Sequence, residues 1–125
     1  MSRFRYGPAS FGENHVYGAQ RPGYHSTTPI LDAEVEEWIE HMRLQGIKRV
    51  CCLLEAQLSY YDSDLLAAYK RAFGEEALCW APIEDFTFAD EKLLTGTILP
   101  FLASSVSREE PVVEQRFLVD DCLAK

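Results

Sequence analysis

The sequence lacks any long hydrophobic run. Its longest stretch without a charged residue runs from Leu93 to Ser107, and Thr95, Gly96, Thr97 and Pro100 interrupt it. A bilayer-spanning helix needs roughly 20 consecutive apolar residues, so the sequence predicts no transmembrane segment. Residues 1–10 also lack the apolar core of a secretory signal after their arginines, and we therefore expect a cytoplasmic protein.

Positive charge is scarce. The 125 residues include 12 Lys and Arg against 20 Asp and Glu, which gives a net charge of -8. An acidic chain repels phosphate backbones and anionic headgroups, so we expect no nucleic-acid or membrane partner. Residues 1–29 are the exception, because only Glu13 opposes Arg3, Arg5 and Arg21. These arginines could form a patch for an acidic or phosphorylated partner, although ordinary solubilising arginines are the more common explanation.

Motifs for metals, nucleotides and serine nucleophiles are also missing. His15, His25 and His41 have no mutual spacing typical of a metal site. The glycines form neither a dinucleotide-binding nor a phosphate-loop motif, and no serine lies in a nucleophile elbow. The sequence therefore predicts no metal and no cofactor.

The four cysteines, Cys51, Cys52, Cys79 and Cys122, do not have zinc-finger spacing. Three of them lie in apolar runs, which is typical of reduced core thiols rather than of a disulfide framework. Cys122 follows two aspartates, whose negative charges disfavour the thiolate that a nucleophile needs. A hydrolase that uses one of these thiols is therefore the least favoured hypothesis.

What the sequence does contain is an alternation of helical and extended patterns. We expect a first helix to be capped by Asp32 and to end before Gly46. Its apolar stripe at helical spacing consists of Val35, Trp38, Ile39 and Met42. A second helix is expected over residues 63–73, with Asp62 as its cap and Gly74 as its stop.

A third helix is expected to begin near Asp90 and to be kinked by Pro100, which has no N–H to donate. Between and around the helices lie short extended segments, two of them continuous apolar runs that predict buried strands. They cover residues 4–6, 15–17, 50–54, 77–81 and 111–113. This order predicts an α/β domain with a mostly parallel central sheet flanked by helices.

In such a sheet the functional loops follow the carboxyl ends of the strands. The loop after the fourth strand carries three carboxylates, Glu84, Asp85 and Asp90, around two phenylalanines. An aspartate beside apolar rings can have the raised pKa that a general acid requires. The more common outcome of this spacing is that Asp90 caps a helix while Glu84 and Asp85 are solvated loop charges.

Four short motifs occur in a defined order along the chain. They are Arg21-Pro22-Gly23, Gly46-Ile47 leading into the apolar run 50–54, Tyr69 to Phe73-Gly74, and Pro82 to Asp85. In this order they resemble the first two-thirds of a dual-specificity phosphatase-like domain of the protein-tyrosine-phosphatase superfamily. The resemblance, which covers residues 4–113, implies hydrolysis of a phosphorylated protein or small phosphoester, with Asp85 in the general-acid position. The family often has a proline later in that loop, where this chain has Phe88-Ala89.

The nucleophile of that family is a cysteine followed, after five intervening residues, by an arginine. The thiolate attacks phosphorus while backbone N–H groups and the arginine hold the phosphoryl oxygens. Here the sixth residue after Cys51 is Gln57, after Cys52 Leu58 and after Cys79 Asp85, and Cys122 has too few residues behind it. The chain therefore contains no such motif, and we expect it to have no nucleophile and to be inactive toward phosphoesters.

The resemblance predicts an incomplete phosphatase-like domain over residues 1–113, followed by a divergent tail over residues 114–125. The family's later helices have no counterpart in that tail. Because a parallel sheet needs cover on both faces, we expect the chain to self-associate. The alternative hypothesis is a non-catalytic binding or regulatory module that buries this face against another chain.

Overall fold

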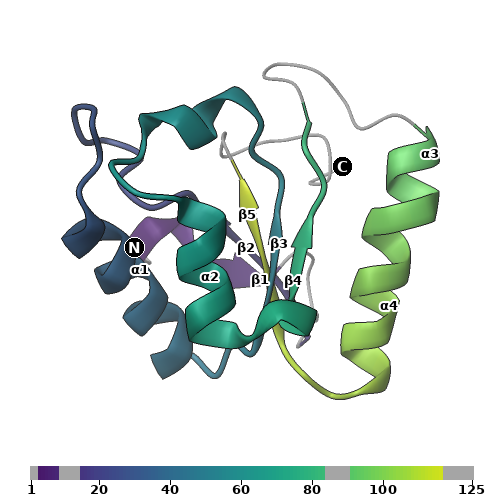
Figure 1. The fold of residues 1–125 in the computed structure, drawn as a ribbon. Helices are drawn as coiled ribbons and strands as arrows, with labels where there is room; N and C mark the ends of the chain where they lie inside the picture. Colours follow the sequence, from purple (N-terminus) through teal and green to yellow (C-terminus); the bar gives the residue numbers. More distant parts are fainter. Residues whose placement is uncertain (1–2, 9–14, 84–90, 117–125) are drawn as a thin grey trace.

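Five strands form one mixed sheet in the computed structural model, which describes residues 3–8, 15–83 and 91–116 (Figure 1). The strands are β1 (Gly7–Pro8), β2 (Val16–Gln20), β3 (Arg49–Cys52), β4 (Leu78–Trp80) and β5 (Val112–Arg116). Their order across the sheet is β1-β2-β5-β3-β4. β1 is antiparallel to β2, and all other pairs are parallel. The predicted α/β class with a mostly parallel sheet is therefore confirmed.

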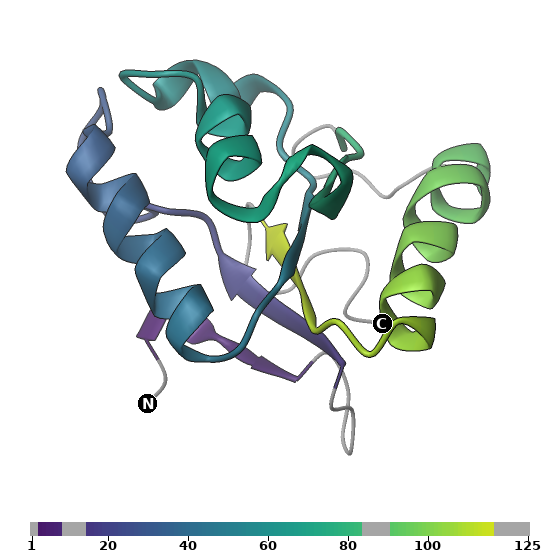
Figure 2. The same ribbon diagram turned by 60° about the horizontal axis from the view of Figure 1, so that its bottom comes forward.

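The helices lie on both sides of the sheet. Figures 1 and 2 show α1 (Asp32–Leu44) and α2 (Leu65–Phe73) together on one side, and α3 (Glu91–Leu93) and α4 (Leu99–Ser107) on the other. A π-helical turn, η4 (Leu94–Ile98), joins α3 to α4. Three short 3-10 turns complete the described elements: η1 (Arg3–Arg5), η2 (Ala56–Tyr60) and η3 (Glu75–Ala77).

The apolar stripe predicted for α1 is confirmed, but its predicted cap is wrong. Val35, Trp38, Ile39 and Met42 are all buried, and Gly46 adopts the expected positive φ of 87° just past the helix. Leu31 is the N-cap residue and makes no side-chain cap hydrogen bond. Asp32 is already inside the helix, where its carboxylate accepts a hydrogen bond from the Ser63 hydroxyl at 3.0 Å.

The second helix begins later than expected, because Asp64 rather than Asp62 caps it. The Asp64 carboxylate accepts a hydrogen bond from the Ala67 N–H at 3.2 Å, and the helix starts at Leu65. The predicted stop is confirmed, since Gly74 has a φ of 103°, a conformation that residues with a Cβ rarely adopt. Leu65 and Tyr69 point into the core from this helix.

The distortion expected at Pro100 takes the form of a π-helical turn. The Leu99 N–H donates to the carbonyl of Leu94, which is the five-residue spacing of a π-helix. The wider turn directly precedes Pro100, whose ring would clash with a regular helical turn. The helix therefore continues through Pro100 to Ser107 instead of ending there.

Two strand predictions need correction. Residues 4–6 do not form a strand, since Phe4 lies in η1 and its ring packs against the His41 ring of α1 at 5.3 Å. The strand expected over 77–81 is confirmed as β4, but β4 lies at the edge of the sheet and its Trp80 is 47% exposed. A strand that is apolar in sequence need not be buried on both faces if it lies at an edge.

The core is centred on β3 and β5, the two strands with a parallel neighbour on each side. Side chains from both strands pair across the sheet in register, with Val50 beside Val113 and Cys52 beside Gln115. The largest fully buried side chains around them are Trp38, Tyr69, Ile30, Met42, Leu53, Leu54, Leu65 and Ile98. None of the helices in the described ranges has the length and apolar character needed to cross a membrane.

Candidate functional site

The carboxyl ends of the parallel strands meet at one edge of the sheet. Along the chain, β2, β3 and β4 lie successively further toward one edge of the sheet. The chain then turns back and inserts β5 between β2 and β3, so the direction of strand addition reverses at β5. α/β sheets commonly build their binding sites outside such a point. β2 ends at Gln20 and β5 at Arg116, which are partners in the register. The edge beside these two residues is the candidate site.

The residue after β2, Arg21, is held by three tyrosines. Its guanidinium carbon lies 5.4 Å from the ring centroids of both Tyr24 and Tyr60. Its Nη1 donates to the hydroxyl oxygen of Tyr61 at 3.4 Å. Tyr60 and Tyr61 follow β3 in the chain, so this cluster joins the loop after β2 to the loop after β3. The cluster of Arg21, Tyr24, Tyr60 and Tyr61 is called the arginine–tyrosine cluster below.

Tyr61 is the buried anchor of this cluster. Its hydroxyl donates to the Pro22 carbonyl at 2.7 Å, and only 7% of the residue is exposed. Burial raises the pKa of Tyr61 to about 12, although the hydrogen bond and positive charge of Arg21 act in the opposite direction. The phenol is therefore protonated at neutral pH. It acts as a donor to the backbone and an acceptor for Arg21, and not as a general base.

A second polar group, Gln115, lies fully buried near the end of β5. Its Oε1 accepts hydrogen bonds from the Cys52 thiol at 3.2 Å and from the Tyr69 hydroxyl at 3.1 Å. Burial raises the pKa of Cys52 to about 12 and that of Tyr69 well above its ordinary value. Cys52 is thus a protonated core thiol, as the apolar run predicted, and cannot act as a thiolate nucleophile at neutral pH.

Cys51 and Cys79 form a thiol pair on the opposite face of the sheet. They are partners in the register of β3 and β4, and both are buried. The hydrogen bond with Cys79, together with burial, raises the pKa of Cys51 well above its ordinary value. The same hydrogen bond lowers the pKa of Cys79, and the positive charge of Arg49 adds to this effect. Cys79 is therefore the described thiol with the greatest tendency to ionise.

The residues that the sequence singled out are only partly brought together. Glu84, Asp85 and Asp90 lie outside the described residues. Arg21 lies at the carboxyl edge, but none of its described contacts involves Arg5, which is exposed in η1. In the described ranges no group of three or more His, Cys, Asp or Glu side chains could hold a metal ion. The residues after Val113 continue as strand to Arg116 rather than forming a loop.

The arginine–tyrosine cluster was not predicted as a unit. The sequence offered one signal, the adjacent tyrosines in the loop after the strand at 50–54. Nothing in the local pattern links them to Arg21, because the hydrogen bond between Arg21 and Tyr61 spans 40 positions. Gln115 was not predicted either. It belongs to residues 114–125, which the resemblance to the phosphatase-like family does not cover.

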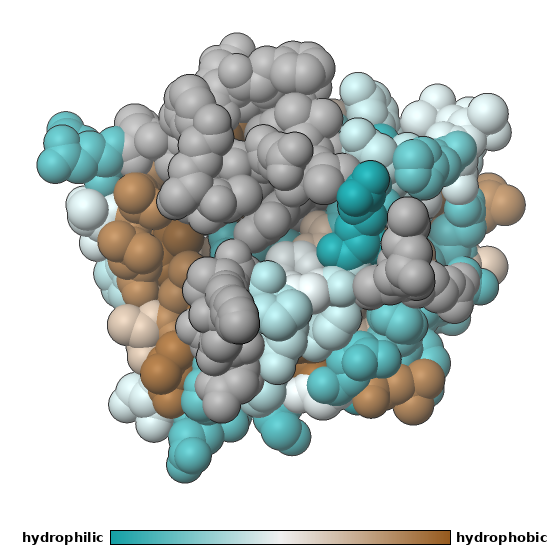
Figure 3. Space-filling model, turned by 180° about the vertical axis from the view of Figure 1, so that it is seen from behind, coloured by the Kyte–Doolittle hydropathy of each residue, from teal (hydrophilic) through white to brown (hydrophobic). Residues whose placement is uncertain are grey.

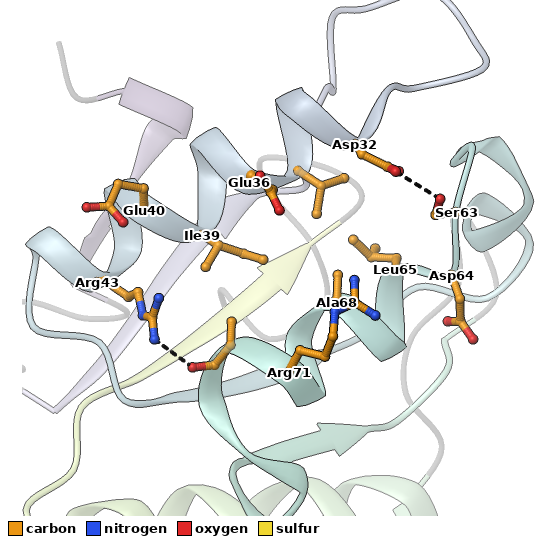
Figure 4. A pocket seen from close by; sticks show the side chains of 12 residues that line it. Asp32, Glu36, Ile39, Glu40, Arg43, Ser63, Asp64, Leu65, Ala68 and Arg71 are labelled. Atoms are coloured by element: carbon orange, nitrogen blue, oxygen red, sulfur yellow. Dashed lines mark hydrogen bonds between the residues drawn. The ribbon is translucent and has the colours of Figure 1, made fainter.

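A surface groove of about 370 Å³ lies elsewhere, between α1 and α2 (Figure 4). A hydrogen bond closes each end: Ser63 donates to Asp32, and Arg43 donates to the Ala72 carbonyl at 3.0 Å. Glu36 and Glu40 line the α1 side, and Leu65, Ala68 and Arg71 line the α2 side. The groove lining contains no thiol and no imidazole, and its one hydroxyl, that of Ser63, has no imidazole beside it to act as a general base.

Comparison with known proteins adds no assignment to this geometry. No family model matches the chain, and no curated protein matches it either.

Proposed function

We propose that this chain is a phosphatase-like domain that binds ligands or partners without hydrolysing phosphoesters. The observation that carries the proposal is the composition of β5, the strand that reaches the centre of the carboxyl edge. Its last described residues are Glu114, Gln115 and Arg116, and none of them is a thiol. In the family that the sequence resembles, the nucleophilic cysteine follows the corresponding strand.

The state of the described thiols supports the same proposal. Cys51 and Cys52 have raised pKa values, and burial contributes to both. Cys79 has a lowered pKa, but Arg49, whose positive charge contributes to this, is buried and is paired with Glu110 at 3.6 Å. A phosphocysteine mechanism needs a thiolate next to free donors for the phosphoryl oxygens. These thiols do not supply that combination.

The test is steady-state hydrolysis of a small aryl phosphate by the purified full chain. We expect no release of the phenol above the rate in buffer. Asp85→Asn and Cys79→Ser variants, checked for folding by circular dichroism, should give the same result. Turnover by the unmodified chain that disappears in either variant would show that the domain is an active phosphatase and would refute the proposal.

We also propose a second function, pairing with a second copy of this chain through the outer face of α4. Leu99 and Val106 are 47% and 42% exposed, and the small residue Ala103 lies exposed between them. Apolar side chains gather along this edge of the molecule in Figure 3. No charged residue occurs from Leu93 to Ser107. A contact along this helix therefore brings no like charges face to face, which limits the repulsion between two chains that each have a net charge of -8.

Antiparallel pairing about a two-fold axis near Ala103 would place Leu99 of each copy opposite Val106 of the other. A Leu99→Glu/Val106→Glu double variant is therefore expected to sediment as a monomer at concentrations where the unmodified chain sediments as a dimer. Leu44→Glu is the matched control, since Leu44 is 74% exposed but lies on α1. A monomeric unmodified chain, or equal loss of dimer in the control, would contradict this arrangement.

A further inference from the structure

The guanidinium of Arg21 is fixed in position by its neighbours. The rings of Tyr24 and Tyr60 both lie within cation–π distance, and Tyr61 accepts one N–H from it. Tyr61 is itself anchored by its hydrogen bond to the Pro22 carbonyl. An arginine held in this way loses little side-chain entropy when it binds a ligand, because its rotamer is already restricted.

No carboxylate neutralises this guanidinium in the described part of the chain. The ion pairs found there join Arg49 and Arg108 to Glu110. Glu34 is close enough to raise the pKa of Tyr61, but it forms no ion pair with Arg21 in the described structure, and its carboxylate accepts a hydrogen bond from the Ser26 hydroxyl. Arg21 is thus restrained by tyrosines, but none of its described contacts is with an acidic side chain. Its charge is available to an outside anion.

The donors of Arg21 are also mostly unused. A guanidinium has five N–H donors in one plane, and its described contacts use one of them. The ring faces attract the positive charge but do not accept the N–H hydrogen bonds that lie in the plane of the guanidinium. A pair of parallel N–H donors therefore remains available to bind two oxygens of an oxyanion. Tyr24 is half-buried and Tyr60 is exposed, which leaves aromatic surface beside that edge.

We propose that the arginine–tyrosine cluster binds an oxyanion carried by an acidic or phosphorylated segment of a partner protein. Arg21 would hold the oxyanion with two N–H groups, while the rings of Tyr24 and Tyr60 contact the residues around it. A protein segment suits the site better than a membrane or nucleic acid, because the net charge of -8 repels an extended anionic surface. The site is formed by the segments after β2 and β3, so it does not depend on the phosphatase relationship.

The experiment titrates the full chain with matched peptides by calorimetry: one with a central phosphoserine, one with glutamate at that position and one with serine. Inorganic phosphate is a fourth probe. We expect binding of the phosphoserine or glutamate peptide and none of the serine peptide. Arg21→Lys keeps the charge but removes the planar fork, and should weaken binding by about tenfold. Arg71→Lys is the control, because the Arg71 side chain is exposed on α2 and makes no hydrogen bond or ion pair within the described structure.

Comparison of the probes decides between sources of the anion. Tighter binding of the phosphoserine peptide identifies a phosphorylated segment, and equal or tighter binding of the glutamate peptide identifies an acidic one. The proposal is overturned if no probe binds, if inorganic phosphate binds as tightly as either peptide, or if Arg71→Lys weakens binding as much as Arg21→Lys. Thermal unfolding of each variant shows that the compared proteins are folded. Release of phosphate during the titration would instead refute the proposed lack of activity and leave this inference intact.

Discussion

Replacing Trp38 with alanine is expected to lower the free energy of unfolding by about 3–5 kcal/mol. Trp38 is fully buried, and its ring packs against that of Tyr69 with the centroids 5.4 Å apart. Its indole N–H donates to the Gln20 carbonyl at 2.8 Å. The substitution therefore opens a cavity between α1, α2 and the sheet and also leaves a buried carbonyl without its donor. Urea denaturation followed by circular dichroism measures the loss.

Two further variants separate the causes of this loss. Trp38→Phe keeps an aromatic ring in the cavity but removes the hydrogen bond to Gln20, and should cost about 1–3 kcal/mol. Leu44→Ala, on the exposed side of the same helix, should change stability by less than about 0.5 kcal/mol. If Trp38→Ala and Leu44→Ala had equal effects, the packing of α1 on the sheet described above would be wrong.

The position of Trp38 explains why the first helix was predicted well. Four apolar residues at helical spacing admit only one buried face, and the sheet supplies the surface that this face must cover. The cap of the second helix was harder, because Asp62 and Asp64 flank Ser63 and both are good capping residues. The choice depends on a tertiary contact, since Ser63 donates to Asp32 of α1, which no local pattern reveals.

The strand errors have a comparable origin. Phe4 and Tyr6 alternate as strand residues do, yet Phe4 packs on His41 and Tyr6 stacks on Tyr17 at 5.1 Å. Sequence periodicity does not distinguish a strand from a turn whose rings pack on a neighbouring helix. Likewise, the apolar run at 77–81 predicted a strand correctly, but its place at the edge of the sheet depends on strand order.

The composition of the candidate site could not be predicted from the sequence. The rule that loops at the carboxyl ends of strands carry function includes the loop after β3, where Tyr60 and Tyr61 lie, but the carboxylates that the sequence singled out follow β4. The contact of these tyrosines with Arg21 arises only when the chain passes from β2 through α1 and back to β3 on the far side of β5. Asp85, the residue that the resemblance made most prominent, lies outside the described residues.

Replacing Arg49 with leucine is expected to cost about 2–3 kcal/mol, because this one side chain connects β3 to α4 and to the turn that follows α4. Its guanidinium carbon lies 4.1 Å from the Phe101 ring centroid, and its Nη1 contacts Ser104 at 3.3 Å and Glu110 at 3.6 Å. Arg49 is buried, but Glu110 is 39% exposed, so water compensates part of the lost ion pair. Urea denaturation gives the change in stability.

Arg108→Leu is the matched control for this prediction. Arg108 contacts the same Glu110 oxygen at 3.8 Å, but its side chain is 56% exposed, so its removal should cost less than about 0.5 kcal/mol.

Amide hydrogen exchange adds a local measurement: exchange in α4 should accelerate in Arg49→Leu more than exchange in α1, which packs on the other side of the sheet. Equal acceleration in both helices would mean that α4 and the sheet unfold as one unit and that Arg49 does not hold α4 locally. A loss of stability confined to Arg49→Leu, with exchange rising first in α4, would instead identify α4 as the most weakly attached helix, held to the sheet from one end of β3.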